Sequence, residues 1–131
     1  MARWWRMPRR LTIILINSDP RNPAELGAPL YQAAVAAAMD YEVEVICTGA
    51  AGALMRQGTA AAIEIKPGSG KTVYDFIREA HGHGARFLAC STNLDLHGLT
   101  REELIPECTG MVGAAYMVER AMDDDTRVLT Y

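Results

Sequence analysis

The sequence predicts an α/β protein, a three-layer α/β/α sandwich around a mostly parallel five-stranded sheet with flavodoxin-like layers. Two observations lead to this prediction. Segments with strand character alternate along the chain with segments of helical spacing, which is the order found in parallel sheets covered by helices on both faces. The 131 residues are 50% hydrophobic and 22% charged, which suits one globular domain with a substantial core.

The first part of the chain contains two predicted strands and one helix. Leu11–Ile16 is a continuous apolar run, typical of a strand buried on both faces. A turn-rich loop over residues 17–23 precedes the alanine-rich segment Ala24–Met39, which has helical spacing. Tyr41–Cys47 alternates between polar and apolar residues and predicts the second strand. Residues 48–56 then form a short helical turn.

The rest of the chain continues this alternation. Residues 61–65 are interpreted as a short third strand. Thr72–His81 is an amphipathic helix that begins at a threonine cap and ends at the following glycines. Arg86–Cys90 is the fourth strand. The remaining predicted elements are a helical turn over residues 99–106 with a Thr100–Glu103 capping box, a helix over 111–122 and a last strand over 127–131.

The composition predicts one domain, residues 11–131, preceded by a basic N-terminal arm over residues 1–10 that we expect to be flexible. A net charge of −3 gives no reason to expect nucleic-acid binding. The sequence shows neither a secretory signal nor an apolar stretch that could span a membrane. Three cysteines without paired spacing do not make a disulfide framework, so we expect free thiols in a reducing cytoplasm.

Cys90 is the strongest candidate for chemistry. It ends a predicted strand and precedes Ser91, Thr92 and Asn93, all good helix N-cap residues. A thiol at this junction lies near unpaired backbone N–H groups and the positive end of the helix dipole, and both favour the thiolate. A buried, inert cysteine is the competing interpretation, and the physical argument alone leaves the two about level.

Other residues form a possible auxiliary set around Cys90. The carboxyl ends of parallel strands share one edge of the sheet, which places Asn17, Cys47 and Cys90 along the same rim. Cys47 is a possible resolving thiol, although a buried cysteine at a strand end is the more frequent case. Asp95 and His97 follow Cys90 by five and seven residues and belong to the auxiliary set as possible neighbours of the thiolate. Cys108 is interpreted as an inert residue in a turn between helices.

Two other patterns do not predict a ligand site. His81, His83 and His97 lack the spacing of a zinc site, so no metal is expected. The Pro67–Thr72 segment resembles a phosphate-binding loop, but Ile65 stands where that motif requires glycine. We therefore interpret it as a turn whose threonine caps the next helix, and we expect no cofactor.

The segment Arg86–Leu99, with Glu103–Ile105 and Gly110–Ala114, resembles the DsrE/DsrF/TusD-like family of sulfur-relay proteins, sometimes described as peroxiredoxin-like. The resemblance extends over most of the chain from Leu11 onward. It implies a compact DsrE-like α/β domain that assembles as a homotrimer or homohexamer. Cys90 matches the reactive cysteine of the family. Some relatives carry two adjacent cysteines, whereas Ser91 stands in the second place here.

The resemblance implies that Cys90 carries sulfane sulfur as a persulfide, without a cofactor. The implied partners are a TusA-like sulfur carrier or a rhodanese. Two alternatives stay open from the sequence. One is a non-catalytic DsrE-like assembly or binding subunit, and the other is a thiol redox protein that uses Cys90 with Cys47.

Overall fold

The computed structural model describes residues 8–131 and confirms the predicted fold class. Five strands form one sheet in the order β4-β3-β2-β1-β5, with every neighbouring pair parallel. This order differs from the 2-1-3-4-5 order of flavodoxin, so the likeness to flavodoxin is one of layers. The strands are β1 (Arg10–Leu15), β2 (Glu42–Cys47), β3 (Arg86–Cys90), β4 (Cys108–Val112) and β5 (Thr126–Thr130).

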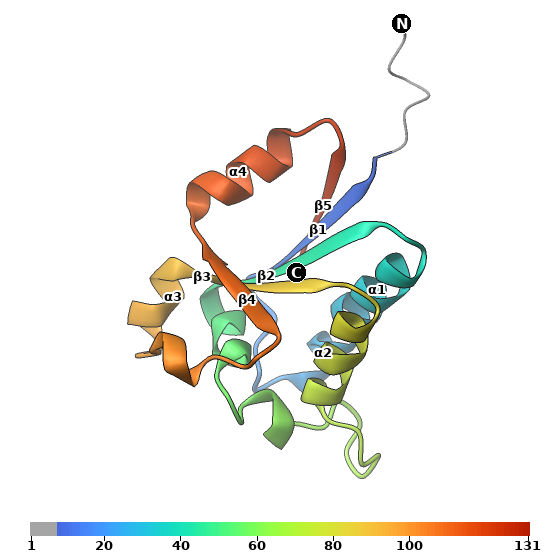
Figure 1. Ribbon diagram of the computed structural model, residues 1–131. Coiled ribbons are helices and arrows are strands. Elements are labelled where there is room, and N and C mark those ends of the chain that lie inside the picture. Colours follow the sequence, from blue (N-terminus) through green and yellow to red (C-terminus); the bar gives the residue numbers. More distant parts are fainter. Residues whose placement is uncertain (1–7) are drawn as a thin grey trace, which may run out of the picture.

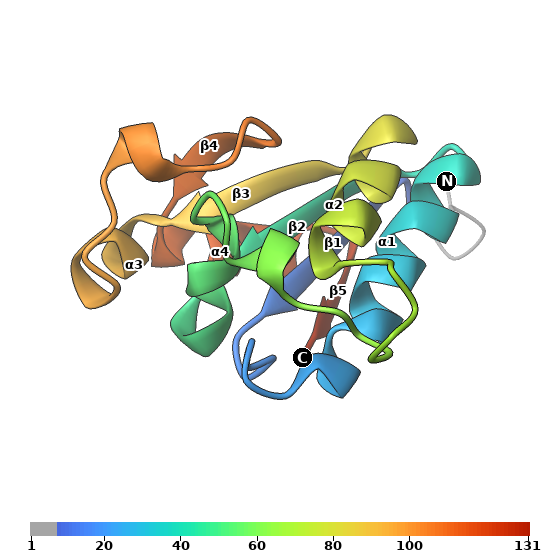
Figure 2. The same cartoon turned by 90° about the horizontal axis from the view of Figure 1, so that it is seen from below.

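Helices cover both faces of this sheet, as Figures 1 and 2 show. Helices α1 (Gly27–Ala38) and α2 (Val73–Gly82) lie side by side on one face, and α4 (Ala114–Met122) lies on the other. Helix α3 (Ser91–Leu96) begins directly after β3, at the carboxyl edge of the sheet. Four short 3-10 helices connect these elements: η1 (Pro23–Glu25), η2 (Gly49–Met55), η3 (Ala60–Ala62) and η4 (Arg101–Glu103).

The two faces of the sheet are buried to different extents. On the α1/α2 face, inward residues of the strands pack with both helices into one large core, which includes Ile13, Val45, Phe87, Leu30 and Ile77. On the α4 face the buried apolar cluster of the described residues is smaller: Ile14, Ile46 and Leu88, covered by two partly buried residues of α4 and two strand residues. No residue of α4 is itself buried. The α4 face therefore has room for polar side chains and open space.

A buried carboxylate ties α4 to the sheet. Glu44 of β2 accepts hydrogen bonds from the Thr12 hydroxyl at 2.8 Å, the Tyr116 hydroxyl at 2.5 Å and the Arg120 Nε at 2.7 Å. Burial alone would raise the pKa of Glu44, but these hydrogen bonds and the guanidinium charge outweigh it and lower the pKa. Glu44 thus stays ionised and anchors a helix that has little apolar burial of its own.

Two predicted elements are wrong. Residues 61–65 do not join the sheet: Ala60–Ala62 is a 3-10 helix, and β2 pairs directly with β3. The strand that completes the five-stranded sheet is instead β4, which begins at Cys108. The last helix therefore begins at Ala114 and not at residue 111. Ile63 and Ile65 pack against the core as partly buried side chains, so their apolar character reflects packing outside the sheet.

Local signals at helix starts are confirmed. The Thr72 hydroxyl caps α2, with Asp75 completing a capping box, and Thr100 and Glu103 form the same arrangement at η4. In the glycine-rich loop before α2, which resembles a phosphate-binding loop, the backbone N–H groups of Gly68 and Gly70 donate to the Glu64 carboxylate.

At the N-terminus, the folded part begins before residue 11. Arg10 is the first residue of β1, and the backbone N–H groups of Arg9 and Arg10 both donate to the Asp125 carbonyl. The rest of the predicted arm, residues 1–7, lies outside the described residues.

Candidate functional site

Cys90 occupies the strand-to-helix junction that the sequence predicts. It is the last residue of β3 and the N-cap residue of α3. Its position two residues after Leu88 places it on the α4 face, and its neighbour in β4 is Val112. The residue is 3% exposed. The thiol is therefore well covered, and its reactivity depends on the groups that surround the sulfur.

Four hydrogen bonds surround the Cys90 sulfur. The Thr92 hydroxyl lies 3.1 Å from Sγ, the Thr48 hydroxyl is a second partner, and the backbone N–H groups of Thr92 and Asn93 also point to it. Burial alone would raise the pKa of Cys90, but these four hydrogen bonds outweigh it and lower the pKa. Because α3 has only six residues, local donors and not a long helix dipole favour the thiolate here.

A single backbone carbonyl fixes α3 beside this sulfur. The Gly49 carbonyl accepts from Asn93 Nδ2 at 2.9 Å and from His97 Nε2 at 2.8 Å. A carbonyl oxygen only accepts, so His97 Nε2 is the donor in this hydrogen bond. Asn93 is buried, and its Oδ1 has no hydrogen-bond partner within residues 8–131. Asn93 and His97 thus position α3.

Gly49 suits this role because other residues would be strained there. Its φ is +55°, and a Cβ would lie 2.8 Å from the Ile16 carbonyl oxygen. A second link continues from the same helix end, since Arg56 donates to the His97 carbonyl at 2.7 Å and pairs with Glu103. We call this set, Gly49, Arg56, Asn93, His97 and Glu103, the α3 brace.

Gly52 offers a direct test of the α3 brace. A Cβ on Gly52 would lie 2.4 Å from Asn93 Nδ2, so Gly52→Ala must displace Asn93 and weaken its contacts with Gly49 and Cys90. We expect a loss of about 1–3 kcal/mol in unfolding free energy. We also expect the pH midpoint of Cys90 alkylation, followed on its own peptide by mass spectrometry, to move upward.

Gly82→Ala is the matched control, because a Cβ there meets nothing within 4 Å. In the helix it should be neutral or stabilising by up to about 1 kcal/mol. An unchanged Cys90 midpoint in Gly52→Ala would show that the α3 brace does not control the thiol.

The remaining predicted residues lie apart from the sulfur or make no polar contact with it. Ser91 and Asp95 are exposed on α3, and neither side chain forms a hydrogen bond in the described part of the chain. Asn17, exposed after β1, lines a cavity of about 310 Å³ with Ser18, Glu25 and Tyr131, and Cys90 is not part of its lining.

Cys47 and Cys108 are less suited to chemistry than Cys90. Cys47 is fully buried in the core on the α1/α2 face, opposite the face of Cys90, and burial is the main cause of its strongly raised pKa. Cys108 begins β4 instead of lying in a turn between helices, and burial raises its pKa as well. All three thiols are free. The structure separates Cys47 from Cys90 by placing them on opposite faces of the sheet.

Thr48 and the residues that hold α3 from outside it were not among the predicted site residues. Thr48 follows β2 directly, and Cys47 pairs with Ala89, so parallel register brings the next residues, Thr48 and Cys90, side by side. The strand register could therefore have predicted the contact between Thr48 and Cys90. No sequence pattern predicts the role of Arg56, because its contacts with His97 and Glu103 cross more than forty residues of sequence.

Comparison with protein families matches residues 64–129, half of the chain and the part that holds Cys90, to the DsrE/DsrF/DrsH-like family. The chain belongs to this family. The resemblance inferred from the sequence is thereby confirmed. The DsrE/DsrF/DrsH-like match begins at Glu64 and so includes the cysteine segment, β4 and α4. Comparison with curated proteins gives no match.

Two solved structures share the fold of this DsrE/DsrF/DrsH-like chain. The YchN protein of E. coli has a TM-score of 0.72 at 18% identity, over 93% of this chain and 99% of YchN. MTH1491 of Methanobacterium thermoautotrophicum, described as a protein of unknown function, has a TM-score of 0.67 at 18% identity, over 93% and 98% of the two chains. These likenesses extend to the N-terminal half that the family match does not cover.

Two kinds of feature are absent from residues 8–131. No helix there has the length and apolar composition that a membrane crossing requires. No group of three His, Cys, Asp or Glu side chains in the same part of the chain is arranged to hold a metal ion.

Proposed function

We propose that this protein carries sulfane sulfur as a persulfide on Cys90, accepting it from a donor persulfide and passing it to an acceptor thiol. The observation that supports this most is the set of four hydrogen bonds to Sγ, which lowers the pKa of a covered thiol. Membership of the DsrE/DsrF/DrsH-like family supports the same role. A stabilised thiolate is the species that attacks sulfur.

The chemistry is thiol exchange. The Cys90 thiolate attacks the outer sulfur of a donor R–S–SH, a bond forms between Cys90 Sγ and that outer sulfur, and the S–S bond of the donor breaks with its electron pair leaving on R–S⁻. The proton of the donor persulfide stays on the transferred sulfur or passes to the departing thiolate. The reverse step on an acceptor thiolate regenerates Cys90. The hydroxyls of Thr48 and Thr92 donate to the anion in the unloaded state.

Loading with a persulfide donor tests this proposal. The wild-type protein should gain about 32 Da, the mass of one sulfur atom, on the peptide that contains Cys90. Cys90→Ser should abolish the gain, whereas Cys47→Ser and Cys108→Ser should keep it. A gain that survives in Cys90→Ser, or one that maps to another cysteine, would contradict the assignment.

A second candidate, a non-catalytic assembly or binding subunit, is favoured by one observation: Cys90 is only 3% exposed. This alternative requires no contact between the sulfur and a donor. It predicts no added sulfur on any peptide and alkylation of Cys90 no faster than that of an ordinary cysteine. The loading experiment therefore separates the two candidates.

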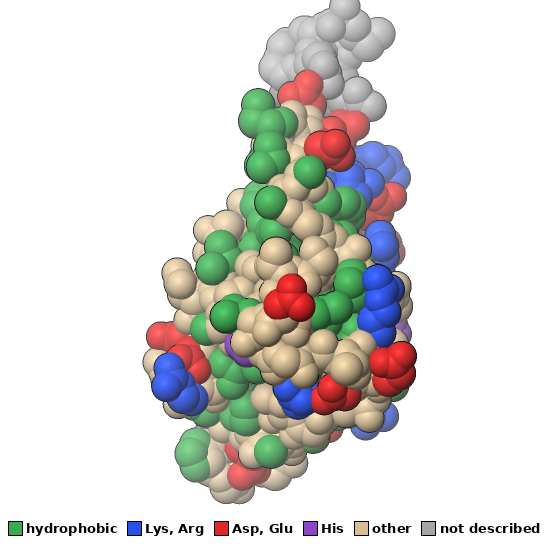
Figure 3. Space-filling model, turned by 90° about the vertical axis from the view of Figure 1, so that its left-hand side faces the viewer, with side chains coloured by type: hydrophobic (Ala, Val, Ile, Leu, Met, Phe, Trp, Pro, Cys, Tyr) green, Lys and Arg blue, Asp and Glu red, His purple; other side chains and the backbone are tan. Residues whose placement is uncertain are grey.

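The proposal includes self-association and a protein partner. Helix α4 presents an outward apolar stripe at helical spacing, made of Ala114, Ala115, Val118, Ala121 and Met122. Val118 and Met122 are 61% and 78% exposed, and Figure 3 shows hydrophobic side chains gathered over this part of the surface. We propose that such surface supports a homotrimer or homohexamer, which light scattering during size exclusion measures. A TusA-like carrier or a rhodanese in a reducing cytoplasm is the proposed exchange partner.

A further inference from the structure

A cavity of about 390 Å³ opens on the α4 face, at the end of the strands opposite to Cys90. Side chains and backbone from three neighbouring strands and the approach to β3 line it: Arg10, Glu42, Val43, Glu44, Gly84 and Arg86. Leu88 lies between Arg86 and Cys90 on this face and packs with Tyr116 and Met117 of α4. The cavity is therefore a separate place from the thiol, and its volume suits a small molecule.

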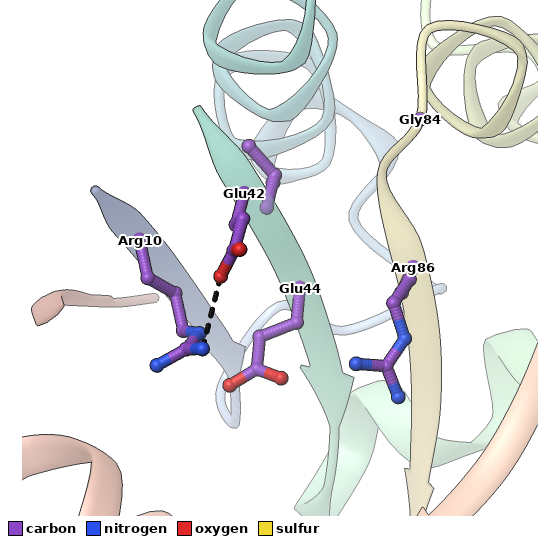
Figure 4. A pocket seen from close by; sticks show the side chains of 6 residues that line it. Arg10, Glu42, Glu44, Gly84 and Arg86 are labelled. Carbon is purple, nitrogen blue, oxygen red and sulfur yellow. Dashed lines mark hydrogen bonds and ion pairs between the residues drawn. The ribbon is translucent and has the colours of Figure 1, made fainter. Parts of the chain in front are cut away.

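Within the described part of the chain, Arg86 in this cavity is an unpaired cation beside an occupied carboxylate. Arg86 and Glu44 are direct neighbours in the β2–β3 register, where opposite charges on one face ordinarily attract. Both oxygens of Glu44 are instead taken by Thr12, Tyr116 and Arg120. Nothing described in residues 8–131 forms a hydrogen bond or an ion pair with the Arg86 guanidinium. The exposed guanidinium carries five N–H donors, and Figure 4 shows the side chain turned toward Glu44.

The other charges of the cavity are arranged differently. Arg10 is already bound, to Glu42 at 2.9 Å and to Asp123 at 3.3 Å. Glu42 uses only Oε2 in that pair, so its Oε1 stays available. Figure 4 shows Arg10 and Arg86 on either side of Glu44, with Glu42 beside Arg10 on the middle strand. Among residues 8–131, the cavity thus offers one free cation, Arg86, and one half-free carboxylate, Glu42, which lie on adjacent strands as diagonal neighbours about 7–8 Å apart by sheet geometry.

This pattern selects a class of ligand. A guanidinium with free donors binds a carboxylate through two parallel hydrogen bonds. The two arginines and two glutamates of the lining sum to zero charge, so a dianion such as phosphate would meet repulsion from Glu42 and Glu44. We propose that the cavity binds a small molecule with an α-amino carboxylate group, its carboxylate on Arg86 and its ammonium on Glu42.

NMR titration of the ¹⁵N-labelled protein tests this site, with L-alanine, L-glutamine and L-methionine as probes. We expect saturable shifts of the backbone amide signals of Gly84, Arg86 and Glu44 with at least one of the three. Arg86→Gln should weaken that binding by at least about tenfold, because it removes a charge-assisted bidentate contact. Glu42→Gln should weaken it as well. Arg78→Gln, an exposed arginine of α2 on the opposite face, should bind as the wild type does.

Acetate and methylammonium separate the two ends of the ligand, and each should bind more weakly than the amino acid. Acetate or phosphate binding as tightly as the amino acid would overturn the proposal, since the ammonium contact would then contribute nothing. Absence of saturable shifts with all three amino acids, or unchanged binding in a folded Arg86→Gln protein, would overturn it too. Cys90→Ser should leave the titration unchanged, so this result is independent of the sulfur-carrier proposal.

Discussion

Replacing both hydroxyls at Cys90, in the double variant Thr48→Val and Thr92→Val, is expected to raise the pKa of its thiol and slow sulfur loading at neutral pH by about tenfold or more. Each hydroxyl contributes a hydrogen bond to the sulfur, and hydrogen bonds to charged groups contribute about 1.5–3 kcal/mol. Part of the lost thiolate is offset, since a thiolate of higher pKa is more nucleophilic. Loading rates on the Cys90 peptide at several pH values measure both effects.

The sign of the pH dependence follows from the lowered pKa of Cys90. The reactive thiolate is populated above that pKa, so the wild-type rate should reach its plateau at lower pH than that of an ordinary cysteine. The plateau of the double variant should shift to higher pH. Thr130→Val, an exposed position in β5, is the control and should match the wild type. Identical profiles for the double variant and the wild type would contradict the role of the hydroxyls.

Replacing Glu44 by glutamine is expected to destabilise the protein by about 2–4 kcal/mol at pH 7. The change removes an ionised acceptor that is 2% exposed and bonded to three donors. Breaking a buried pair leaves an uncompensated charge, and Arg120 is partly exposed, so water relieves some of the cost. Denaturant unfolding measures the loss, and hydrogen exchange should show the amides of α4 losing protection first.

This stabilisation should depend on pH in a defined direction. Because the pKa of Glu44 is lowered in the folded protein, its contribution is present above the ordinary glutamate pKa and is lost as pH falls through the folded value. The gap between wild type and variant should therefore narrow in acid. Glu42→Gln in the same strand is the control: its ion pair is exposed and should contribute under about 1 kcal/mol. Equal losses from both variants would argue against a buried anchor.

The fold could be predicted from the sequence wherever burial was periodic or continuous. Leu11–Ile16 and Tyr41–Cys47 each match a strand to within one residue, because their apolar side chains face a core. The edge strand β4 could not be recognised, since Cys108–Val112 has no fully buried residue and contains a glycine. The strand predicted over residues 61–65 was wrong for the opposite reason: Ile63 and Ile65 are apolar and pack on the core, but they do so from outside the sheet.

For the candidate site, the sequence predicted the position of Cys90 but not its surroundings. Strand and cap signals are local, so they place Cys90 and Thr92 at one junction. The contacts of Thr48 with Cys90 and of Gly49 with His97 depend on strand register and loop path, which single-sequence patterns do not specify. The sequence patterns also do not predict on which face of the sheet each thiol lies. The structure places Cys47 and Cys90 on opposite faces.

The central claim is that Cys90 both receives sulfur and gives it up. Its most direct test loads the protein with isotopically labelled sulfane sulfur, removes the donor, adds a reduced acceptor thiol and follows the label by mass spectrometry. We predict that the label appears on the Cys90 peptide and then moves to the acceptor, with Cys90 returning to its unmodified mass. A Cys90 peptide that never acquires the label, or that keeps it in the presence of the acceptor, would contradict the proposed carrier function.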